Sequence, residues 1–488
     1  MIKMTKNIKD LLKSVDIIES VGELNIEIKE LHFDSRKVEE GDFFIAQVGT
    51  QSDGHDFISK AIEQGAKAIL CERLPENINP NITYIKVENT SKALSTLAHN
   101  FYDCPSDNIK LVGVTGTNGK TTIASLLYQL FKKLGYKVGL LSTVTNYIDT
   151  KEVKATHTTP DAIQISKLLN DMIEEGCDYC FMEVSSHAID QHRTRALNFK
   201  GGIFTNLTHD HLDYHKTFDA YLRAKKGFFD QLGKTSFAIT NADDKNGKIM
   251  LQNTKAHKFT YSTRTFADYR CQILEKHFNG MLLEMDGVEL WTNFIGDFNA
   301  HNLLSVYGAA RLLDQSKEEI LTKMSELRSV AGRFESIISP DGIMAIVDYA
   351  HTPDALKNVL MTIDQLRTRN ETVITVVGAG GDRDKTKRAP MGEISAEYSD
   401  KVILTSDNPR SENPETIITE IREGISAENL RKVLAIADRK EAIRTAIMLA
   451  KKDDIILVAG KGHEDYQEIN GTKHHFDDKE IINEIFNQ

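Results

Sequence analysis

A glycine-rich segment at 116–122, GTNGKTT, contains the residue types that bind nucleotide phosphates. Its glycines let backbone amides approach phosphate oxygens, and a helix beginning there would direct its positive end at the same group. Lys120 would reach the β- and γ-phosphates, and the Thr121 hydroxyl would ligate Mg²⁺. The general spacing of such loops requires glycine where Val114 stands, so a glycine-rich turn without a ligand is the alternative. The predicted ATP contacts here are Gly116, Thr117, Asn118, Gly119, Lys120, Thr121 and Thr122.

Acids and histidines follow two further apolar segments. Residues 179–193, YCFMEVSSHAIDQHR, begin as an apolar strand with Glu183 at its end, where a carboxylate can share a magnesium ion with Thr121. The segment THDHLDYH at 208–215 follows another strand, and His211 or an adjacent acid could bind a second Mg²⁺. A solvated polar loop is the alternative, and the residue types do not decide between the two. The sequence has no HExxH spacing, which disfavours a zinc hydrolase.

Two pairs of reactive side chains have simple structural interpretations. Lys225 and Lys226 lie in a predicted helix at 220–232, where such a pair is by default an exposed basic face. Cys177 and Cys180 form one CxxC without a second pair, so we expect them to pack in the core where a strand begins. On residue types alone, neither pair indicates a catalytic role.

The strands and helices that position these residues are predicted from alternating apolar runs and helical patterns. From Ile109 this alternation predicts a parallel α/β sheet, and it restarts after 331–337. In open α/β sheets, ligands gather at the carboxyl ends of strands, where the segments above lie. The first twenty residues predict a charged amphipathic helix. Buried strands are expected at 111–114, 179–183, 202–207, 343–347, 372–377, 402–405 and 454–458.

Length and composition restrict the class of protein. The 488 residues exceed what one hydrophobic core supports, and three composition regimes predict domains at 1–104, 105–332 and 333–488. The net charge of −11 argues against broad binding to nucleic acid or to an anionic membrane. The N-terminus lacks an apolar signal-peptide core, no apolar run is long enough to span a membrane, and five cysteines suit a reducing compartment. We therefore expect a soluble, cytoplasmic protein.

Ten motifs occur in order along nearly the whole chain. They are GTNGKTT (116–122), HTTPDA (157–162), MEVSSHAIDQHR (182–193), TNLTHDHLDYH (205–215), GDFNAHN (296–302), GRFE (332–335), DYAHTPDAL (348–356), GGDRDKTKR (380–388), SDNPR (406–410) and GKGHEDYQ (460–467). Together they closely resemble the Mur ligase family, although GTNGKTT alone is shared with folylpolyglutamate synthetases. The resemblance implies three α/β domains: an N-terminal uridine-nucleotide-binding domain, a central P-loop ATPase domain with a parallel sheet, and a C-terminal Rossmann-like domain.

The resemblance also implies a reaction with small-molecule substrates. ATP would phosphorylate the D-glutamate γ-carboxylate of the peptidoglycan precursor UDP-N-acetylmuramoyl-L-alanyl-D-glutamate, and an amino acid's amine would displace phosphate from the acyl phosphate. Mg²⁺ would neutralise the two anions that must meet. A monomer without nucleic-acid partners or membrane insertion is expected. The implied catalytic residues are Lys120, Glu183, His211 and Lys225, and the implied metal ligands are Thr121, Glu183, His211 and Lys225 as a carbamate.

The family's binding residues match further positions of this chain. Arg193 is chemically sensible among them, because a cation neutralises a substrate carboxylate or phosphate. The residues implied to hold the uridine-nucleotide substrate are Ser35, Thr158, Thr159, Ser185, Gln191 and Arg193. The positions implied to contact ATP between the central and C-terminal domains are Asn302, Arg333 and Asp348.

The choice of amino acid depends on the motif DNPR. Meso-diaminopimelate has a second carboxylate that lysine lacks, and an arginine pairs with a carboxylate bidentately. Arg410 follows a predicted strand, Arg383 lies in a second such loop, and relatives resembling lysine-adding enzymes lack the DNPR arginine. The predicted diaminopimelate contacts are Arg383, Asp407, Asn408, Pro409, Arg410, Gly460 and Glu464. The alternatives are a surface turn at DNPR, lysine as substrate, another Mur or folylpolyglutamate-type ligase, and a P-loop motor or regulatory ATPase.

Overall fold

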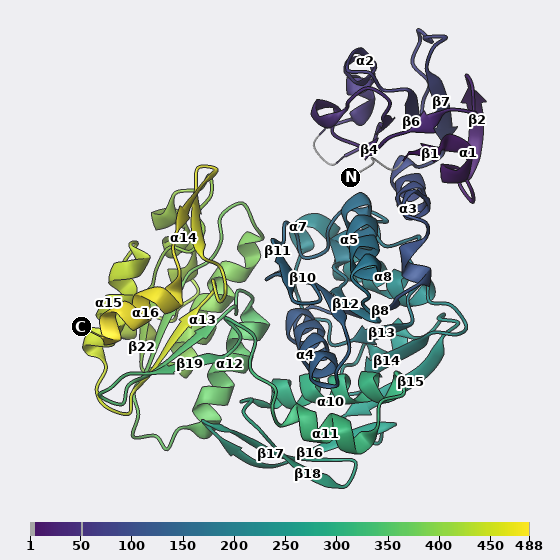
Figure 1. Cartoon of the computed structure of the whole chain (residues 1–488). Helices are drawn as coiled ribbons and strands as arrows, with labels where there is room; N and C mark the ends of the chain where they lie inside the picture. Colours follow the sequence, from purple (N-terminus) through teal and green to yellow (C-terminus); the bar gives the residue numbers. More distant parts are fainter. Residues whose placement is uncertain (1–4, 50–51, 488) are drawn as a thin grey trace.

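Three large sheets follow one another along the described part of the chain, and two small antiparallel pairs of strands accompany them. The computed structural model describes residues 5–49 and 52–487. Figure 1 shows the N-terminal sheet (purple) at one end, the central sheet (teal) below it, and the C-terminal sheet (green to yellow) beside the central one. The predicted α/β class, with parallel strands in each of the three large sheets, is confirmed.

The N-terminal sheet has the strand order β2-β7-β6-β5-β4. Its last four strands are parallel, and β2 joins antiparallel to β7. The predicted N-terminal amphipathic helix is wrong: helix α1 covers only Ile8–Leu11, because the β-branched run that follows pairs as strand β2. The elements are β1 Lys6–Asn7, α1 Ile8–Leu11, β2 Ile17–Val21, β3 Glu27–Ile28, β4 Leu31–His32, β5 Phe43–Ile45, α2 Ile58–Glu63, β6 Ala68–Cys71, β7 Thr83–Val87 and α3 Thr90–Phe101.

The central sheet has eleven strands in the described part of the chain, in the order β11-β10-β9-β12-β8-β13-β14-β15-β16-β17-β18. Strands β9 to β16 in this order are parallel, as predicted, but antiparallel hairpins extend both edges. The strands are β8 Lys110–Thr115, β9 Val138–Leu141, β10 Asn146–Ile148, β11 Lys151–Val153, β12 Tyr179–Glu183, β13 Gly201–Phe204, β14 Phe237–Asn241, β15 His257–Ser262, β16 Tyr269–His277, β17 Gly280–Met285 and β18 Val288–Thr292.

Helices cover both faces of the central sheet. Apolar residues of α4, α10 and α11 form one buried cluster against it, and residues of α5 and α8 form a second cluster on the other face. Cys177 and Cys180 are buried in the second cluster, which confirms their predicted place in the core. The helices are α4 Lys120–Lys133, α5 Ala162–Glu174, α6 Ser186–Asp190, α7 Leu212–His215, α8 Phe218–Asp230, α9 Gly247–Met250, α10 Asp297–Leu312 and α11 Lys317–Met324.

The register of the central strands brings three loops together. Strand β8 lies between β12 and β13, with Glu183 opposite Val114 and Phe204 opposite Thr115. The glycine-rich segment, the carboxylate of Glu183 and the loop after β13 therefore leave the sheet at one edge. This is the edge at which parallel α/β sheets place their ligands.

The C-terminal sheet has the order β19-β20-β24-β21-β22-β23, with antiparallel β19 at one edge. The four strands predicted in this part of the chain are confirmed within one residue at each end, and they pair parallel. The elements are β19 Glu335–Ile338, β20 Met344–Asp348, α12 Pro353–Leu366, β21 Val373–Val377, α13 Arg388–Tyr398, β22 Lys401–Leu404, α14 Pro414–Arg422, β23 Val433–Ala435, α15 Arg439–Leu449, β24 Ile455–Ala459, β25 Tyr466–Ile469, β26 Thr472–His475 and α16 Asp478–Phe486.

Within the described residues, none of the helices is both long enough and apolar enough to cross a membrane. All five cysteines lie in that part of the chain and are free thiols.

A buried ion pair joins helices α15 and α16 to the C-terminal sheet. Arg439 Nε and Nη2 donate to the two carboxylate oxygens of Asp478, each at 2.8 Å, and Nη2 also donates to the Ala459 carbonyl at 3.1 Å. Both side chains have an exposed fraction of 0%. Removing one partner of such a pair leaves an uncompensated buried charge, which costs about 3–5 kcal/mol.

We therefore expect Asp478→Asn to lower the free energy of unfolding of this part of the chain by about 3–5 kcal/mol. Scanning calorimetry, which resolves separate transitions, would measure the change. Glu484→Gln is the matched control, because Glu484 pairs with Lys440 between the same two helices at an exposed position. Its expected cost is below about 1 kcal/mol. Equal costs for the two variants would contradict the prediction.

Candidate active site

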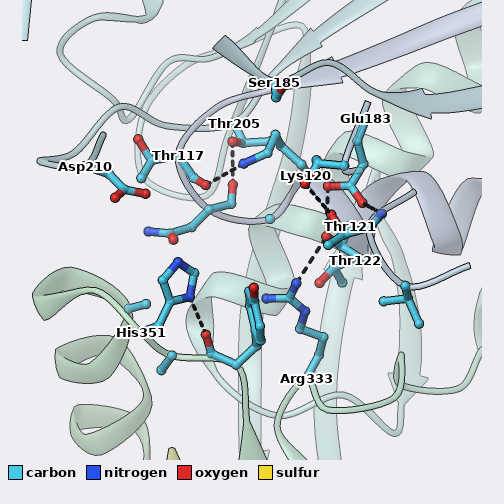
Figure 2. Close-up of a pocket in the computed structure, with 18 of the residues that line it drawn as sticks. Thr117, Lys120, Thr121, Thr122, Glu183, Ser185, Thr205, Asp210, Arg333 and His351 are labelled. Atoms are coloured by element: carbon cyan, nitrogen blue, oxygen red, sulfur yellow. Dashed lines mark hydrogen bonds between the residues drawn. The ribbon is translucent and has the colours of Figure 1, made fainter. Parts of the chain in front are cut away.

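A cleft of about 1510 Å³ lies between the carboxyl edge of the central sheet and the C-terminal sheet. Residues of the glycine-rich segment line one side, and residues that follow β20, β21, β22 and β24 line the other. Hydrogen bonds cross the cleft: Asn118 Nδ2 donates to Asp354 Oδ2 at 2.9 Å, and Arg333 Nη2 donates to Thr121 Oγ1 at 3.1 Å. Figure 2 shows Arg333 pointing toward the start of helix α4.

The glycine-rich segment forms a tight loop between β8 and α4, as predicted. Gly119 has a φ of +86°, and a Cβ there would lie 2.7 Å from Asn302 Oδ1, so the position needs glycine. Lys120 folds back over the loop, with Nζ donating to the carbonyls of Gly116 and Thr117 at 3.0 and 2.8 Å. Desolvation lowers the pKa of Lys120. An anion in the cleft would provide the counter-charge that this lysine needs.

Thr121 and Glu183 meet at the start of helix α4. Thr121 Oγ1 donates to Glu183 Oε2 at 2.9 Å, and the other oxygen, Oε1, accepts from the backbone N–H of Thr143 at 2.7 Å. The Glu183 side chain is buried, with an exposed fraction of 1%. The sequence prediction that the end of β12 places this acid beside Thr121 is therefore confirmed by the geometry.

Lys225 is buried, and for it the default interpretation as an exposed basic face is wrong. Helix α8 directs the side chain under the phosphate loop, where Nζ donates to the Gly116 carbonyl at 2.7 Å and lies 4.8 Å from the centre of the Tyr221 ring. Burial, followed by the charge of Lys120, holds the pKa of Lys225 well below its ordinary value. Lys226 instead points to Asp230 on the same helix.

The loop after β13 divides into buried and exposed parts. Asp210 has an exposed fraction of 7%, whereas His209 and Asp213 are exposed. His211 has a φ of +54°, and its Nε2 lies 3.4 Å from Asp210 Oδ2. Burial is the largest cause that lowers the pKa of His211, so the imidazole is neutral near pH 7 and able to bind a metal ion.

The donor set fits Mg²⁺. A threonine hydroxyl and a buried carboxylate are hard oxygen donors, and Mg²⁺ binds few protein ligands because it keeps several waters. In residues 5–49 and 52–487, no cluster of three or more His, Cys, Asp or Glu side chains could hold a metal ion alone. The metal site would therefore need donors of other types, such as the Thr121 hydroxyl. Burial lowers the pKa of Lys225, which favours its neutral amine.

The residues predicted to hold the muramoyl peptide lie beside the phosphate loop. Thr159 Oγ1 donates to the Glu183 carbonyl at 2.8 Å and accepts from the Ser185 N–H at 3.0 Å. Arg193 Nη1 donates to the Thr159 carbonyl at 2.7 Å, and its Nη2 donates to Gln191 Oε1 at 2.6 Å. Thr158 Oγ1 accepts from Thr143 Oγ1 at 3.1 Å. These contacts hold the segments 158–159 and 185–193 together.

The predicted nucleotide contacts also converge. Arg333 stacks on the Tyr349 ring at 4.5 Å, and Asp348 Oδ2 accepts from the backbone N–H of Phe334 at 2.6 Å. Burial raises the pKa of Asp348 to about 6. Asn302 lies against Gly119 on the opposite side of the cleft.

The loops after β21, β22 and β24 meet as the diaminopimelate prediction requires. A Cβ added at Gly380 would lie 3.0 Å from Arg410 Nη1 and 3.7 Å from Arg383 Cγ, so the two arginines approach one another. Arg410 Nη1 donates to the Gly381 carbonyl at 2.7 Å, and Nε lies 3.3 Å from Glu468 Oε2. Asp407, Asn408, Gly460 and Glu464 line the same cleft. DNPR is therefore not an isolated surface turn.

Four predicted residues do not line this cleft: Ser35, Gly116, Gln191 and Pro409. Ser35 is buried in the N-terminal part of the chain, at the start of the short helical turn Ser35–Lys37. Gly116 and Gln191 contribute indirectly, because the Gly116 carbonyl accepts from Lys120 and Lys225 and Gln191 accepts from Arg193.

Several cleft residues were not predicted. His351 lines the cleft opposite Asp210, with its Nδ1 hydrogen-bonded to the Tyr349 carbonyl at 2.8 Å, and burial lowers its pKa to about 4. Asp354 also lines the cleft and accepts a hydrogen bond from Asn118 of the phosphate loop. Lys461 does not line the cleft but is fully buried behind Asn408. These residues lie in the motifs DYAHTPDAL and GKGHEDYQ. Membership in those motifs was therefore the sequence feature that could have identified them.

Three family models match successive parts of the chain. The descriptions are "Mur ligase family, catalytic domain" for residues 27–102, "Mur ligase middle domain" for 114–310, and "Mur ligase, glutamate ligase domain" for 332–462.

Curated relatives and a solved structure cover nearly the whole chain. The UDP-N-acetylmuramoyl-L-alanyl-D-glutamate–2,6-diaminopimelate ligase of Phocaeicola vulgatus is 57% identical over 98% of this chain and 99% of its own length. The ligase of the same name from Bacteroides thetaiotaomicron is 56% identical over 98% of this chain and 100% of its own. A solved structure with that enzyme's name superposes with a TM-score of 0.69 at 30% identity, covering 99% of both chains.

Proposed function

The chain belongs to the Mur ligase family, and from this premise we propose that it ligates meso-2,6-diaminopimelate to UDP-N-acetylmuramoyl-L-alanyl-D-glutamate with ATP. It is an ATP-dependent, amide-bond-forming ligase, as members of this family are. Relatives 55–57% identical over nearly the full chain are named UDP-N-acetylmuramoyl-L-alanyl-D-glutamate–2,6-diaminopimelate ligase. The observation that carries the choice of substrate is the convergence of the phosphate loop and the DNPR loop on one cleft. ATP and an amino acid with a second carboxylate would then meet in the same space.

The first half of the reaction brings two anions together. The D-glutamate γ-carboxylate attacks the γ-phosphorus of ATP, the bond to the β–γ bridging oxygen breaks, and ADP leaves. Lys120 and the N-terminus of α4 would stabilise the transferred phosphoryl group, and Arg333 would stabilise the nucleotide from the C-terminal side. Mg²⁺, when held by Thr121, Glu183, His211 and a carbamate on Lys225, supplies further neutralisation of charge.

The second half of the reaction forms the amide. The amine nitrogen of diaminopimelate bonds to the acyl-phosphate carbon, the carbon–oxygen bond to phosphate breaks, and the amine loses a proton. Arg410 and Arg383 would bind the distal carboxylate, and Asp407 and Glu464 would bind the distal ammonium. The remaining contacts in this proposal are Asn408, Pro409 and Gly460.

The uridine-nucleotide substrate would extend from the cleft toward the N-terminal sheet. We assign residues 1–104 to the uridine nucleotide, with Ser35 as a contact, 105–332 to ATP, and 333–488 to the amino acid and the nucleotide. Thr158, Thr159, Ser185, Gln191 and Arg193 would hold the peptide beside Glu183. The hydrogen bonds from Thr159 to the Glu183 carbonyl and from Arg193 to the Thr159 carbonyl support this assignment. We further propose that the enzyme works in the cytoplasm, because its proposed substrates are free nucleotides and an amino acid, and that it acts as a monomer.

The decisive assay is phosphate release with ATP, Mg²⁺ and UDP-N-acetylmuramoyl-L-alanyl-D-glutamate. We expect release with meso-diaminopimelate, and little with lysine or with no amino acid, because lysine would leave the arginines unpaired. Mass spectrometry should show a nucleotide product heavier by one diaminopimelate residue. Equal release with lysine would contradict the specificity, and release without any amino acid would contradict the ligase reaction.

A further inference from the structure

A lysine with no role in the reaction as described lies buried behind the diaminopimelate loops. Lys461 follows strand β24 and has an exposed fraction of 0%. Its Nζ donates to Asn408 Oδ1 at 3.1 Å and to the Tyr466 carbonyl. Two acids are near: Glu464 Oε2 at 3.6 Å and Asp407 Oδ1 at 3.9 Å. Burying an ammonium is costly, and these four oxygens from neighbouring loops compensate for it together.

Lys461 fixes the orientation of the Asn408 amide. Asn408 Oδ1 accepts from Lys461 and from the backbone N–H of Glu468 at 2.9 Å, whereas Nδ2 donates to Glu464 Oε2 at 2.7 Å. A flipped amide would turn its N–H₂ toward two donors and lose all three bonds. Lys461 therefore orients the Asn408 amide, and the amide in turn orients the Glu464 carboxylate through a hydrogen bond.

The same lysine ties the hairpin of β25 and β26 to the DNPR loop. Tyr466, whose carbonyl binds Lys461, begins β25. Two residues further on, Glu468 accepts from the Arg410 N–H at 3.0 Å, and its carboxylate lies against the guanidinium. Lys461 thus stands at the junction between the acidic side of the predicted amino-acid site and the side that carries Arg410.

We propose that Lys461 is a positioning residue for the amino-acid substrate. It holds the carboxylates of Glu464 and Asp407 in the place that binds the distal ammonium, and it anchors the hairpin that orients Arg410 toward the distal carboxylate. This inference rests on the proposed function, because it assigns the two acids and Arg410 to one zwitterionic end of the substrate.

The charge state of Glu464 gives the role a signature in the pH profile. Burial first, and then the charge of Asp407, raise the pKa of Glu464, whereas Lys461 opposes the rise. The other groups that face this carboxyl are Tyr349, Asn408, Arg410, Arg439 and Tyr466. Glu464 binds an ammonium only when ionised, so binding is lost as the pH falls through its pKa. Without Lys461 that pKa rises further, and the loss begins at a higher pH.

Lys461→Met, which keeps the shape and removes the charge, tests the proposal by steady-state kinetics. We expect the KM for meso-diaminopimelate to rise at least about tenfold, with kcat and the KM for ATP changed less than about twofold. The acid limb of kcat/KM for diaminopimelate should move to higher pH. Lys461→Gln retains an N–H donor without the charge, so it should show the same pH shift with a smaller rise in KM.

Lys432→Met is the matched control, because Lys432 of the same part of the chain also donates two hydrogen bonds, to the carbonyls of Ala396 and Ser399, and contacts neither the DNPR loop nor Glu464. It should leave both KM values and the pH profile unchanged. Parallel rises in the KM for ATP and for diaminopimelate, or an unmoved pH profile, would overturn the positioning role. If Lys461→Met does not fold, Lys461→Gln decides by the same criteria. A wild-type enzyme inactive with diaminopimelate overturns the proposed function, and this inference with it.

Discussion

Replacing Lys225 by alanine is expected to lower kcat by roughly a hundredfold to a thousandfold, the loss seen when one stabilising group at a developing charge is removed. The side chain has an exposed fraction of 1% and binds the Gly116 carbonyl at 2.7 Å, within the phosphate loop. Burial holds its pKa well below the ordinary value, which favours the neutral amine, and we propose that this amine attacks CO₂ to form a carbamate and release a proton. The variant would lack this anionic ligand for Mg²⁺.

A short carboxylic acid such as acetate should restore part of the kcat of Lys225→Ala, because it supplies a carboxylate in the space that the side chain leaves. Lys225→Arg should remain inactive with or without acetate, since a guanidinium stays charged and cannot form the carbamate. Lys226→Ala is the matched control on the same helix, because its ion pair with Asp230 faces away from the cleft. Full activity in Lys225→Ala would remove this residue from the mechanism.

Glu183 and Lys225 differ in whether the sequence predicts their position in the site. Glu183 could be placed because a run of apolar residues ending in an acid predicts a buried strand, and parallel strands end at one edge of a sheet. Lys225 could not be placed, because two adjacent lysines on a helix do not show which one is buried. That depends on how α8 packs against the phosphate loop, which is a tertiary contact. Only the family resemblance selected it.

Tertiary pairing also explains the errors in the fold. The residues Ile17–Val21 follow a helix-like polar pattern, but β-branched residues pair readily, and β7 offers them a partner. Residues of the cleft such as His351 and Asp210 come from different sheets, so no local pattern indicates that they face one another. The four C-terminal strands, in contrast, were predictable because fully buried parallel strands are continuous apolar runs between polar turns.

The DNPR loop carries the largest expected effect on substrate choice. We expect Arg410→Ala to lower kcat/KM for meso-diaminopimelate at least about a hundredfold, because a buried carboxylate would lose its charge-assisted partner. The value for lysine should not fall, since lysine has no distal carboxylate to lose a contact. The ratio of the two kcat/KM values therefore measures the role of Arg410 independently of any general loss of activity. Arg422→Ala, an exposed arginine on α14, is the control and should leave the ratio unchanged.

Arg410→Lys separates charge from geometry. The Gly381 carbonyl and Glu468 occupy Nη1 and Nε of Arg410, which fixes the plane of the guanidinium and leaves its other N–H groups to bind a carboxylate. An ammonium keeps the charge but not this planar arrangement, so the variant should recover only part of the selectivity. If Arg410→Lys recovered the selectivity in full, a point charge would be sufficient. If Arg410→Ala left the selectivity unchanged, the role would belong instead to Arg383 on the neighbouring loop.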